Sequence, residues 1–333
     1  MSKRILVTGA AGFIGMHVAL RYLEQGDEVV GHDNLNPYYS VALKRDRLEQ
    51  LTKFKSFQFI EGDLADRMAI EKLFAEGAFT HVHHLGAQGG VRYSIEKPHE
   101  YLASNVVGFL NILEGCRHHK PRHLVFASSS SVYGDSPNLP YSEKQNVDYP
   151  VSLYAATKKS NELMAHAYAQ LYHIPISGLR FFTVYGPWGR PDMAVWKFTE
   201  AIFTGKPLTL FAEGKLKRDF TYIDDVVEGV VRVGDVSPIT SESGAPYRIL
   251  NIGNYAPVVV NDLVAALEKI TGKKANRVNA SHQMGDVEAT FADTSAIETL
   301  VGFKPSTPIE EGLRRFVQWY KEYQTATSDP RPT

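Results

Sequence analysis

Short apolar, β-branched runs alternate with amphipathic helical patterns over the first half of the chain. The runs that predict buried strands are residues 4–8, 28–32, 57–60, 81–85, 123–127 and 176–181. Helical patterns lie between them, notably over residues 101–116 and 153–172. This alternation predicts an α/β fold, a doubly wound parallel sheet covered by helices on both faces.

The pattern changes after residue 182, where Gly and Pro punctuate the chain as far as residue 207. A helix is predicted over residues 221–233, a buried strand over 247–252, and two more helices from residue 257 onward. We therefore expect a Rossmann domain of residues 1–182 with 221–256. A smaller, discontinuous, mixed α/β C-terminal domain would comprise residues 183–220 with 257–324. Residues 325–333 contain Ala326 as their one apolar residue and are expected to form a frayed tail.

Composition narrows the class of protein. The 36 Lys and Arg residues nearly balance the 37 Asp and Glu residues, which argues against a nucleic-acid partner. The 44% hydrophobic and 22% charged content is typical of globular chains, and no apolar stretch is long enough to predict a membrane span. A single cysteine, Cys116, cannot form an intrachain disulfide and suits a reducing compartment, so a cytoplasmic location is expected.

Three glycines follow the first predicted strand and open the first helix. Gly9, Gly12 and Gly15 would let the backbone turn tightly and approach a pyrophosphate, which binds at a helix N-terminus. Asp33 ends the second predicted strand, where a carboxylate accepts hydrogen bonds from an adenosine ribose and repels a 2′-phosphate. The pattern predicts NAD rather than NADP as cofactor. Asp63 and Leu64 follow the third strand, where they would either meet the adenine or, through Asp63, cap the next helix.

A serine run and a tyrosine–lysine pair carry the candidate chemistry. The predicted strand 123–127 delivers the serines of residues 128–131 to the carboxyl edge of the sheet, where such folds bind ligands. Tyr154 and Lys158 are four residues apart and share one helix face. The lysine charge would lower the tyrosine pKa, so that the tyrosine, once ionised, could take a hydroxyl proton while a serine shares it.

Two other polar patterns predict nothing catalytic. His81 and His83 share a strand face next to His84, but no nearby acid or cysteine completes a ligand set, so no metal is expected. The charged run of residues 44–47 is interpreted as a solvated helix face, with covering the cofactor as the alternative.

Five longer stretches resemble a known family: residues 33–39, 87–94, 150–158, 180–193 and 218–225. From residue 4 to about residue 323 the chain resembles the extended short-chain dehydrogenase/reductases, and among them the UDP-glucuronate 4-epimerases. It departs from them at Gly86 and Gly89, where family members commonly have alanine. In the related dehydratases an Asp-Glu pair takes the positions of Ser130 and Ser131, so dehydration is disfavoured.

The resemblance implies an isomerase that epimerises C4 of UDP-glucuronate to UDP-galacturonate, with NAD as cofactor and a transient 4-keto sugar. The alternatives are a UDP-glucose 4-epimerase, a UDP-glucuronate decarboxylase and, in another class, a non-catalytic NAD-sensing protein of the same fold. The larger domain would bind NAD and the smaller one the nucleotide sugar. The helical stretches 101–116 and 153–172 would pair with a second copy in a homodimer.

The resemblance also implies roles for single residues. The catalytic residues would be Ser129, Tyr154 and Lys158. In addition to Tyr154 and Lys158, NAD would contact Gly9, Gly12, Phe13, Ile14, Gly15, Asp33, Asn34, Asp63, Leu64, Leu85 and Ala87. The UDP-sugar would contact Gln88, Arg92, Ser129, Ser130, Ser131, Thr183, Arg190, Arg218 and Asp286. Of these, the Ser130, Ser131 and Thr183 hydroxyls would hold the sugar carboxylate.

Overall fold

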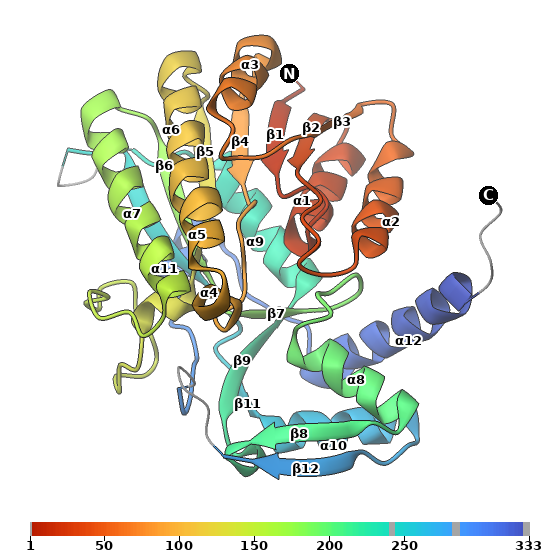
Figure 1. Ribbon diagram of the computed structural model, residues 1–333. Helices are drawn as coiled ribbons and strands as arrows, with labels where there is room; N and C mark the ends of the chain where they lie inside the picture. Colours follow the sequence, from red (N-terminus) through yellow and green to blue (C-terminus); the bar gives the residue numbers. More distant parts are fainter. Residues whose placement is uncertain (1, 240–243, 282–286, 329–333) are drawn as a thin grey trace.

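The computed structural model describes residues 2–239, 244–281 and 287–328. Its central sheet has seven parallel strands in the order β10-β6-β5-β4-β1-β2-β3 (Figure 1). The strands are β1 Arg4–Thr8, β2 Glu28–Asp33, β3 Phe57–Glu61, β4 His81–His84, β5 His123–Ser129, β6 Ile176–Phe181 and β10 Tyr247–Ile252. The strand order reverses between β1 and β4, which is the topological switch point of a Rossmann sheet. The predicted doubly wound fold is confirmed.

Both faces of this sheet are buried under helices. Ile5 and Val7 belong to one apolar cluster with α1 Phe13–Glu24 and α9 Ile223–Asp235. Leu6 points to the other face, where it joins the cluster formed by α3 Arg67–Gly77, α6 Gly108–His119 and α7 Leu153–Tyr172. Successive strand residues therefore pack on opposite faces, which explains why these strands are apolar along their whole length.

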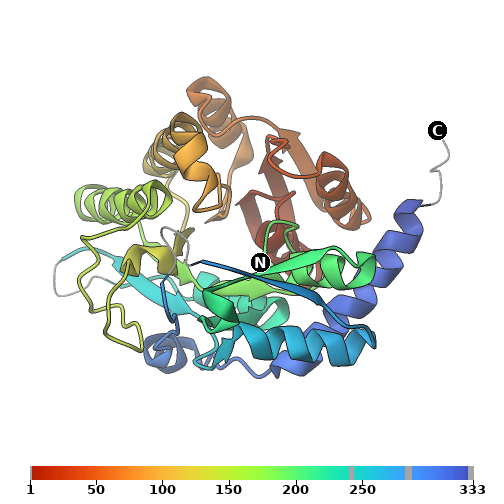
Figure 2. The ribbon, with the colours of Figure 1, turned by 60° about the horizontal axis from the view of Figure 1, so that its bottom comes forward.

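The remaining elements form a smaller lobe below the carboxyl ends of the strands (Figure 1). Its strands are β7 Thr183–Tyr185, β8 Pro207–Phe211, β9 Lys217–Tyr222, β11 Pro257–Val259 and β12 Asn276–Ala280. They form one three-stranded sheet, β11-β9-β7, and one parallel pair, β12-β8. Its helices are α8 Ala194–Thr204, α10 Val260–Thr271 and α12 Ile309–Ser328. Figure 2 brings this end forward and shows α8, α10 and α12 beside the β8 and β12 strands.

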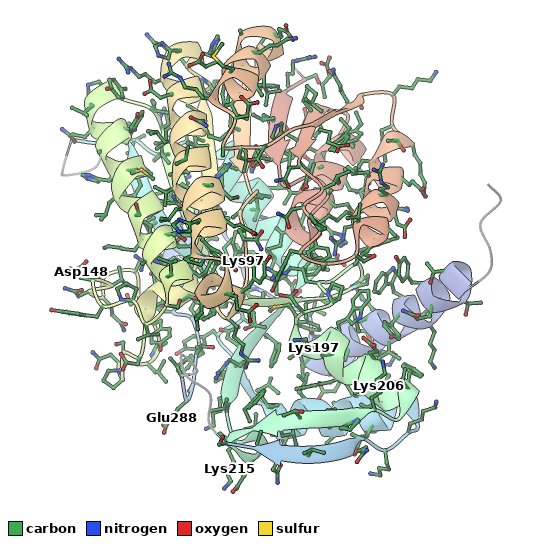
Figure 3. All side chains as sticks on the ribbon, viewed as in Figure 1. Lys97, Asp148, Lys197, Lys206, Lys215 and Glu288 are labelled. Carbon is green, nitrogen blue, oxygen red and sulfur yellow. The ribbon has the colours of Figure 1, made fainter. Side chains whose placement is uncertain are left out.

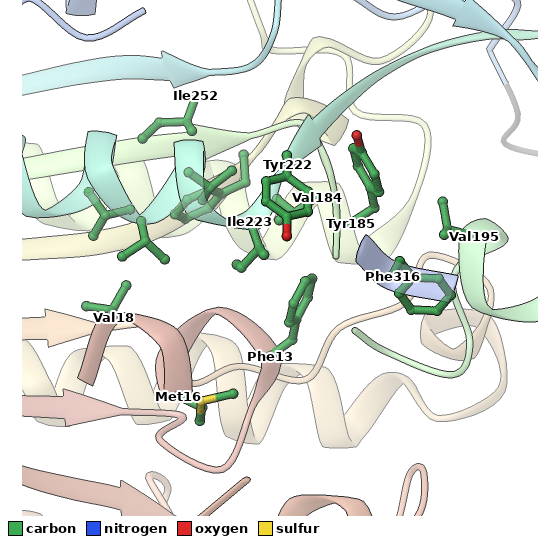
Figure 4. Close-up of a cluster of buried hydrophobic side chains, with 14 of the residues drawn as sticks. Phe13, Met16, Val18, Val184, Tyr185, Val195, Tyr222, Ile223, Ile252 and Phe316 are labelled. Atoms are coloured by element: carbon green, nitrogen blue, oxygen red, sulfur yellow. The ribbon is translucent and has the colours of Figure 1, made fainter. Parts of the chain in front are cut away.

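An apolar seam joins the two lobes. Phe13 and Met16 of α1 face Tyr222 and Ile223, where β9 runs into α9, and Phe316 of α12 lies beside them (Figure 4). All five side chains are buried. Because one continuous cluster contains residues of both lobes, the edge of the sheet and the smaller lobe are held in fixed relative positions.

Three stretches differ from the sequence expectation. The helix predicted over residues 101–116 consists of α5 Pro98–Tyr101, a π-helical segment Leu102–Val107 and α6. Three helices rather than two follow residue 257, because α11 Ser295–Val301 precedes α12. Residues 325–328, assigned to a frayed tail, continue α12, where Thr325 and Thr327 donate to carbonyls four residues earlier. The described residues contain two further α-helices, α2 Val41–Thr52 and α4 Tyr93–Glu96. No helix of the described residues is long and apolar enough to cross a membrane.

Candidate functional site

A cavity of about 580 Å³ opens at the carboxyl ends of the central strands. This volume lies within the ~300–1,000 Å³ typical of small-molecule sites. The cavity is lined by nearly all the predicted site residues: Gly9, Gly12, Phe13, Ile14, Gly15, Asp33, Asn34, Asp63, Leu64, Leu85, Ala87, Gln88, Ser129, Ser130, Ser131, Tyr154, Lys158, Thr183 and Arg190. Other charged residues, such as Asp148, Lys206 and Lys215, lie on the outer surface (Figure 3).

The glycine turn brings bare backbone to the cavity wall. Gly9 has a φ of +71°, and a Cβ on it would lie 2.7 Å from the backbone nitrogen of Gly86. A Cβ on Gly15 would lie 2.1 Å from the carbonyl oxygen of Gly9. Gly12 caps α1 without a side chain, so the first N–H groups of that helix are left for a ligand. The turn therefore has the form that a pyrophosphate requires.

Two carboxylates stand where the adenosine half of a dinucleotide would lie. The Asp33 oxygens accept hydrogen bonds from the backbone N–H groups of Ala11, at 3.2 Å, and Leu35, at 2.9 Å. Asp63 accepts from the Asn34 amide at 2.9 Å and from the N–H of Ala65 at 2.8 Å. The helix α3 is capped by Asp66, not by Asp63, so the alternative capping role predicted for Asp63 is wrong.

The serine run turns sharply at the end of β5. Ser129 is the last residue of that strand, and its hydroxyl accepts from the N–H of Ser131 and donates to the Ser131 hydroxyl, both at 3.1 Å. One residue earlier, the Ser128 hydroxyl donates to Glu162 of α7 at 2.5 Å. Arg180 of β6 donates twice to the same carboxylate, at 2.8 and 2.7 Å. Through Glu162, both β5 and β6 are therefore linked to the helix that carries Tyr154 and Lys158.

Next to Ser129, the lysine of α7 is buried and the tyrosine is partly buried. Burial raises the pKa of Tyr154, while the hydrogen bond with Ser129 and the charge of Arg190 act to lower it. The ammonium of Lys158 donates to the carbonyl oxygen of Ala127 at 2.9 Å, and burial lowers its pKa to about 8. The predicted downward shift of the tyrosine pKa by the lysine is therefore wrong for this structure, because desolvation is the largest effect on both groups.

Arg190 approaches the cavity from the smaller lobe together with Thr183, the first residue of β7. Its Nε and Nη2 donate to the two carboxylate oxygens of Asp192, at 3.0 and 2.6 Å. The Tyr38 hydroxyl donates to the same carboxylate at 3.1 Å. Although burial acts to raise the pKa of Asp192, the charge and hydrogen bonds of Arg190 lower it overall.

The loop of residues 86–90 is held by side chains that the sequence pattern did not reveal. The Asn105 amide accepts from the N–H of Gln88 at 2.7 Å and donates to its carbonyl at 3.0 Å. Tyr101 donates to the carbonyl of Gly89 at 2.7 Å. Asn105 lies in the π-helical segment, where the wider turn shifts side-chain positions relative to an α-helix. A buried asparagine in an apolar helical pattern was the available sequence signal.

Three predicted substrate residues do not line the cavity or cannot be placed there. The guanidinium of Arg92 lies over the ring of Phe211, 4.9 Å from its centroid. Arg218 donates to the carbonyl oxygens of Lys217, at 2.9 Å, and Glu288, at 3.5 Å. Asp286 lies outside the described residues. Their contacts with a ligand remain predictions.

The charged run of residues 44–47 is not a solvated face. Lys44, Asp46 and Arg47 are buried, and Lys44 lines the cavity. Arg47 donates to the carbonyl oxygens of Trp188 and Gly189, at 2.7 and 2.9 Å, and to that of Ala11 at 3.0 Å. The arginine thus connects the glycine turn to the loop that precedes Arg190, and the prediction failed because tertiary contacts override the helical pattern.

The histidines of β4 are engaged by the sheet. His83 contacts the Tyr22 hydroxyl at 2.9 Å, and His84 contacts the Thr8 hydroxyl at 2.9 Å. Within residues 2–239, 244–281 and 287–328, no group of three or more His, Cys, Asp or Glu side chains is arranged to hold a metal ion. Burial raises the pKa of the Cys116 thiol, so this residue has no reactive character.

Comparison with known proteins agrees with this geometry. The family model described as the NAD dependent epimerase/dehydratase family matches residues 5–253. UDP-glucuronate 4-epimerase 1 of Arabidopsis thaliana is 50% identical over 96% of this chain and 77% of that protein. An uncharacterized 37.6 kDa protein of Escherichia coli O111:H- is 54% identical over 96% of this chain and 99% of that protein.

Solved structures show the same relationship. The chain is similar to UDP-glucuronic acid 4-epimerase from Bacillus cereus in complex with UDP-glucuronic acid and NAD, with a TM-score of 0.89, 36% identity, and coverage of 96% of this chain and 99% of that chain. It is also similar to a UDP-glucose 4-epimerase from Thermotoga maritima, with a TM-score of 0.85, 29% identity and the same coverage of both chains. With a family model that covers most of its length and relatives of this identity, the chain belongs to the NAD dependent epimerase/dehydratase family.

Proposed function

We propose that this protein is an NAD-dependent UDP-glucuronate 4-epimerase, which converts UDP-glucuronate to UDP-galacturonate through a transient 4-keto sugar. The observation that carries the proposal is a single cavity in which Ser129, Tyr154 and Lys158 meet both the glycine turn and Arg190. Relatives that are 46% and 50% identical over 96% of this chain bear the names probable UDP-glucuronate 4-epimerase and UDP-glucuronate 4-epimerase 1.

The residues present fit NAD. The turn at Gly9, Gly12 and Gly15 leaves no room for a Cβ, so its backbone N–H groups would hold the pyrophosphate, and Asp33 would hold the adenosine ribose. When bound, NAD supplies reversible hydride transfer at C4 of the sugar. Lys158, whose ammonium already points to the β5 carbonyl at Ala127, would hold the nicotinamide ribose.

The protein's own groups move the proton. Tyr154, ionised as a phenolate, would take the proton of the sugar 4-hydroxyl and return it after the sugar has turned, while Ser129 shares a hydrogen bond with the same oxygen. The tyrosine is partly buried and desolvation raises its pKa, so it needs the nearby positive charge of Arg190 and the Ser129 hydroxyl to favour its ionised form.

The hydroxyls around the cavity suit a substrate that must keep its carboxylate. A 4-keto glucuronate is a β-keto acid, which loses CO₂ when the breaking C–C bond stands perpendicular to the carbonyl plane. Ser130, Ser131 and Thr183 line the cavity and would hold the carboxylate near that plane. This arrangement favours epimerisation over decarboxylation.

We extend the proposal to the architecture. Residues 1–182 with 221–256 would bind NAD, and residues 183–220 with 257–324 would bind the nucleotide sugar. A homodimer would form across α6, the π-helical segment and α7. Exposed apolar side chains on these helices support it: Leu102, Val107, Leu110, Leu163 and Leu171.

The test is incubation of the purified protein with UDP-glucuronate and no added cofactor, followed by separation of the sugar nucleotides. UDP-galacturonate alone is the expected product, because NAD is regenerated in each cycle and stays bound. A pentose nucleotide as main product would make the protein a decarboxylase. Equal rates on UDP-glucose and UDP-glucuronate would instead favour the neutral-sugar epimerase.

A further inference from the structure

The guanidinium of Arg190 is fixed from behind. Arg190 lines the cavity, whereas Asp192 is absent from the described residues that line it. Two of the three guanidinium nitrogens donate to Asp192 in the two-pronged geometry that gives the strongest arginine–carboxylate pairs. The Tyr38 hydroxyl donates to the same carboxylate, which holds the acid in turn.

The third nitrogen lies against the loop that carries Gln88. A Cβ on Gly89 would be 2.6 Å from Nη1 of Arg190, so the guanidinium packs directly against the backbone of this loop. The arginine is therefore confined between Asp192 and the backbone at Gly89.

We propose that Asp192 is a positioning residue, which holds Arg190 back from direct pairing with the sugar carboxylate and so leaves the 4-keto sugar free to turn. The inference rests on the proposed function, because it assumes an anionic sugar that must present both faces. From the sequence we predicted a substrate contact for Arg190 but no role for Asp192.

The physical reason is competition between two carboxylates. While Asp192 accepts both forked donors, a substrate carboxylate meets only the field of a compensated ion pair and stays on the hydroxyls of Ser130, Ser131 and Thr183. Without Asp192 the guanidinium could swing onto the substrate and form its own two-pronged pair. Such a pair would bind the anionic sugar more tightly in one orientation. Because tighter binding of a single ground-state orientation opposes the turn between the two hydride transfers, turnover would fall.

The experiment compares Asp192→Asn with the wild type on UDP-glucuronate and UDP-glucose. The asparagine keeps the size of the side chain and removes its charge. We expect the Kd of UDP-glucuronate, measured by calorimetry, to fall by roughly tenfold, in line with a gained charge-assisted hydrogen bond. The kcat for UDP-glucuronate should fall by a similar factor, and the Kd of UDP-glucose should stay within about twofold.

Two controls separate positioning from support of the loop. Asp192→Glu restores a carboxylate and should return the UDP-glucuronate kcat and Kd toward wild-type values. In an Arg190→Ala background, Asp192→Asn should change neither sugar's Kd, because the acid acts only through the arginine. If Asp192→Asn does not fold, Asp192→Ser in the wild-type and Arg190→Ala backgrounds provides the same comparison.

Three results would overturn the inference. Equal losses for both sugars would show that Asp192 merely supports the loop, and a weaker affinity for UDP-glucuronate would show that it holds the arginine toward the sugar. If Asp192→Asn had the same effect in the Arg190→Ala background as in the wild type, Asp192 would act through another group. A wild type that binds UDP-glucuronate but gives no UDP-galacturonate would refute the proposed function instead, and the calorimetric comparison of the two sugars would still test the pair.

Discussion

The two ends of strand β5 bury polar side chains in different ways. At its first residue, the His123 ring contacts the Gly234 carbonyl at 3.0 Å and the Ser177 hydroxyl at 2.8 Å, so both nitrogens are engaged within the protein. At its last residue, Ser129 lies with Tyr154 and Lys158 along the wall of a cavity. The strand is equally buried at both ends.

This contrast shows that burial and a shifted pKa do not by themselves identify an active site. Burial lowers the pKa of His123 to about 3 and that of Lys158 to about 8. The histidine is a neutral structural group whose hydrogen bonds are completed by the fold. The lysine and its neighbours differ because polar atoms from several elements converge on a space that a ligand can enter.

The largest expected effect is at the cavity end. Tyr154→Phe removes only the ionisable oxygen, so turnover of UDP-glucuronate should fall by ~10²–10⁴-fold, the usual contribution of a general acid/base. NAD content and the Kd of UDP-glucuronate should change little. Single-turnover assays and calorimetry on the same preparation check both parts. Turnover within threefold of wild type would remove Tyr154 from the chemistry.

The next effect concerns cofactor retention. Asp33→Ala should weaken NAD binding by ~1.5–3 kcal/mol for each charge-assisted hydrogen bond lost from the ribose. Denaturing the purified variant and measuring released nicotinamide nucleotide should give less than one equivalent, with about one from the wild type. Full retention by the variant would show that Asp33 does not hold the ribose.

At the opposite end of β5 we expect a loss of stability without a loss of chemistry. His123→Leu leaves the Ser177 hydroxyl and the Gly234 carbonyl without their ring partner, which should lower the free energy of unfolding by ~1–3 kcal/mol. Urea unfolding measures this change. The kcat of the folded variant should equal that of the wild type, and a specific loss of kcat would break the contrast between the two ends.

The last expected effect is a pH dependence of stability. The pKa of His123 is about 3 in the folded protein, and its ordinary value in the unfolded chain is near 6.5. Between pH 6.5 and pH 3, therefore, only the unfolded chain binds this proton. The stabilising contribution is complete above pH 6.5 and falls as the pH drops, by up to ~1.4 kcal/mol per pH unit. Between pH 7 and pH 4.5, the free energy of unfolding should change less with pH in His123→Leu than in the wild type. Identical slopes would show that this ring does not titrate on unfolding.

The sequence revealed those parts of the fold and site that depend on spacing along the chain. Gly9, Gly12 and Gly15 sit at one turn, and Tyr154 and Lys158 share one helix face, so local geometry was enough to group them. The strands were predicted from their apolar runs, and those of residues 4–8, 176–181 and 247–252 match β1, β6 and β10 at both ends.

The remaining contacts depend on tertiary packing. Arg47 was interpreted as solvated because its neighbours are charged, but its Nε and Nη2 donate to the loop at Trp188 and its Nη1 donates to Ala11 and Tyr39. Asn105 holds Gln88 only because a π-helical turn brings it there. Asp192 is only two residues from Arg190, but its carboxylate also accepts from Tyr38, which is far away in the sequence. Sequence spacing identifies groups on one element, whereas these partners lie on elements or loops that meet only in the folded chain.

The central claim is tested most directly by following C4 of the sugar by proton NMR in D₂O, with the purified protein, UDP-glucuronate and no added cofactor. Hydride removed from C4 and returned to it never exchanges with solvent, so UDP-galacturonate should form with its C4 proton fully retained. Deuterium at C4 of the product, or no UDP-galacturonate at all, would contradict the account.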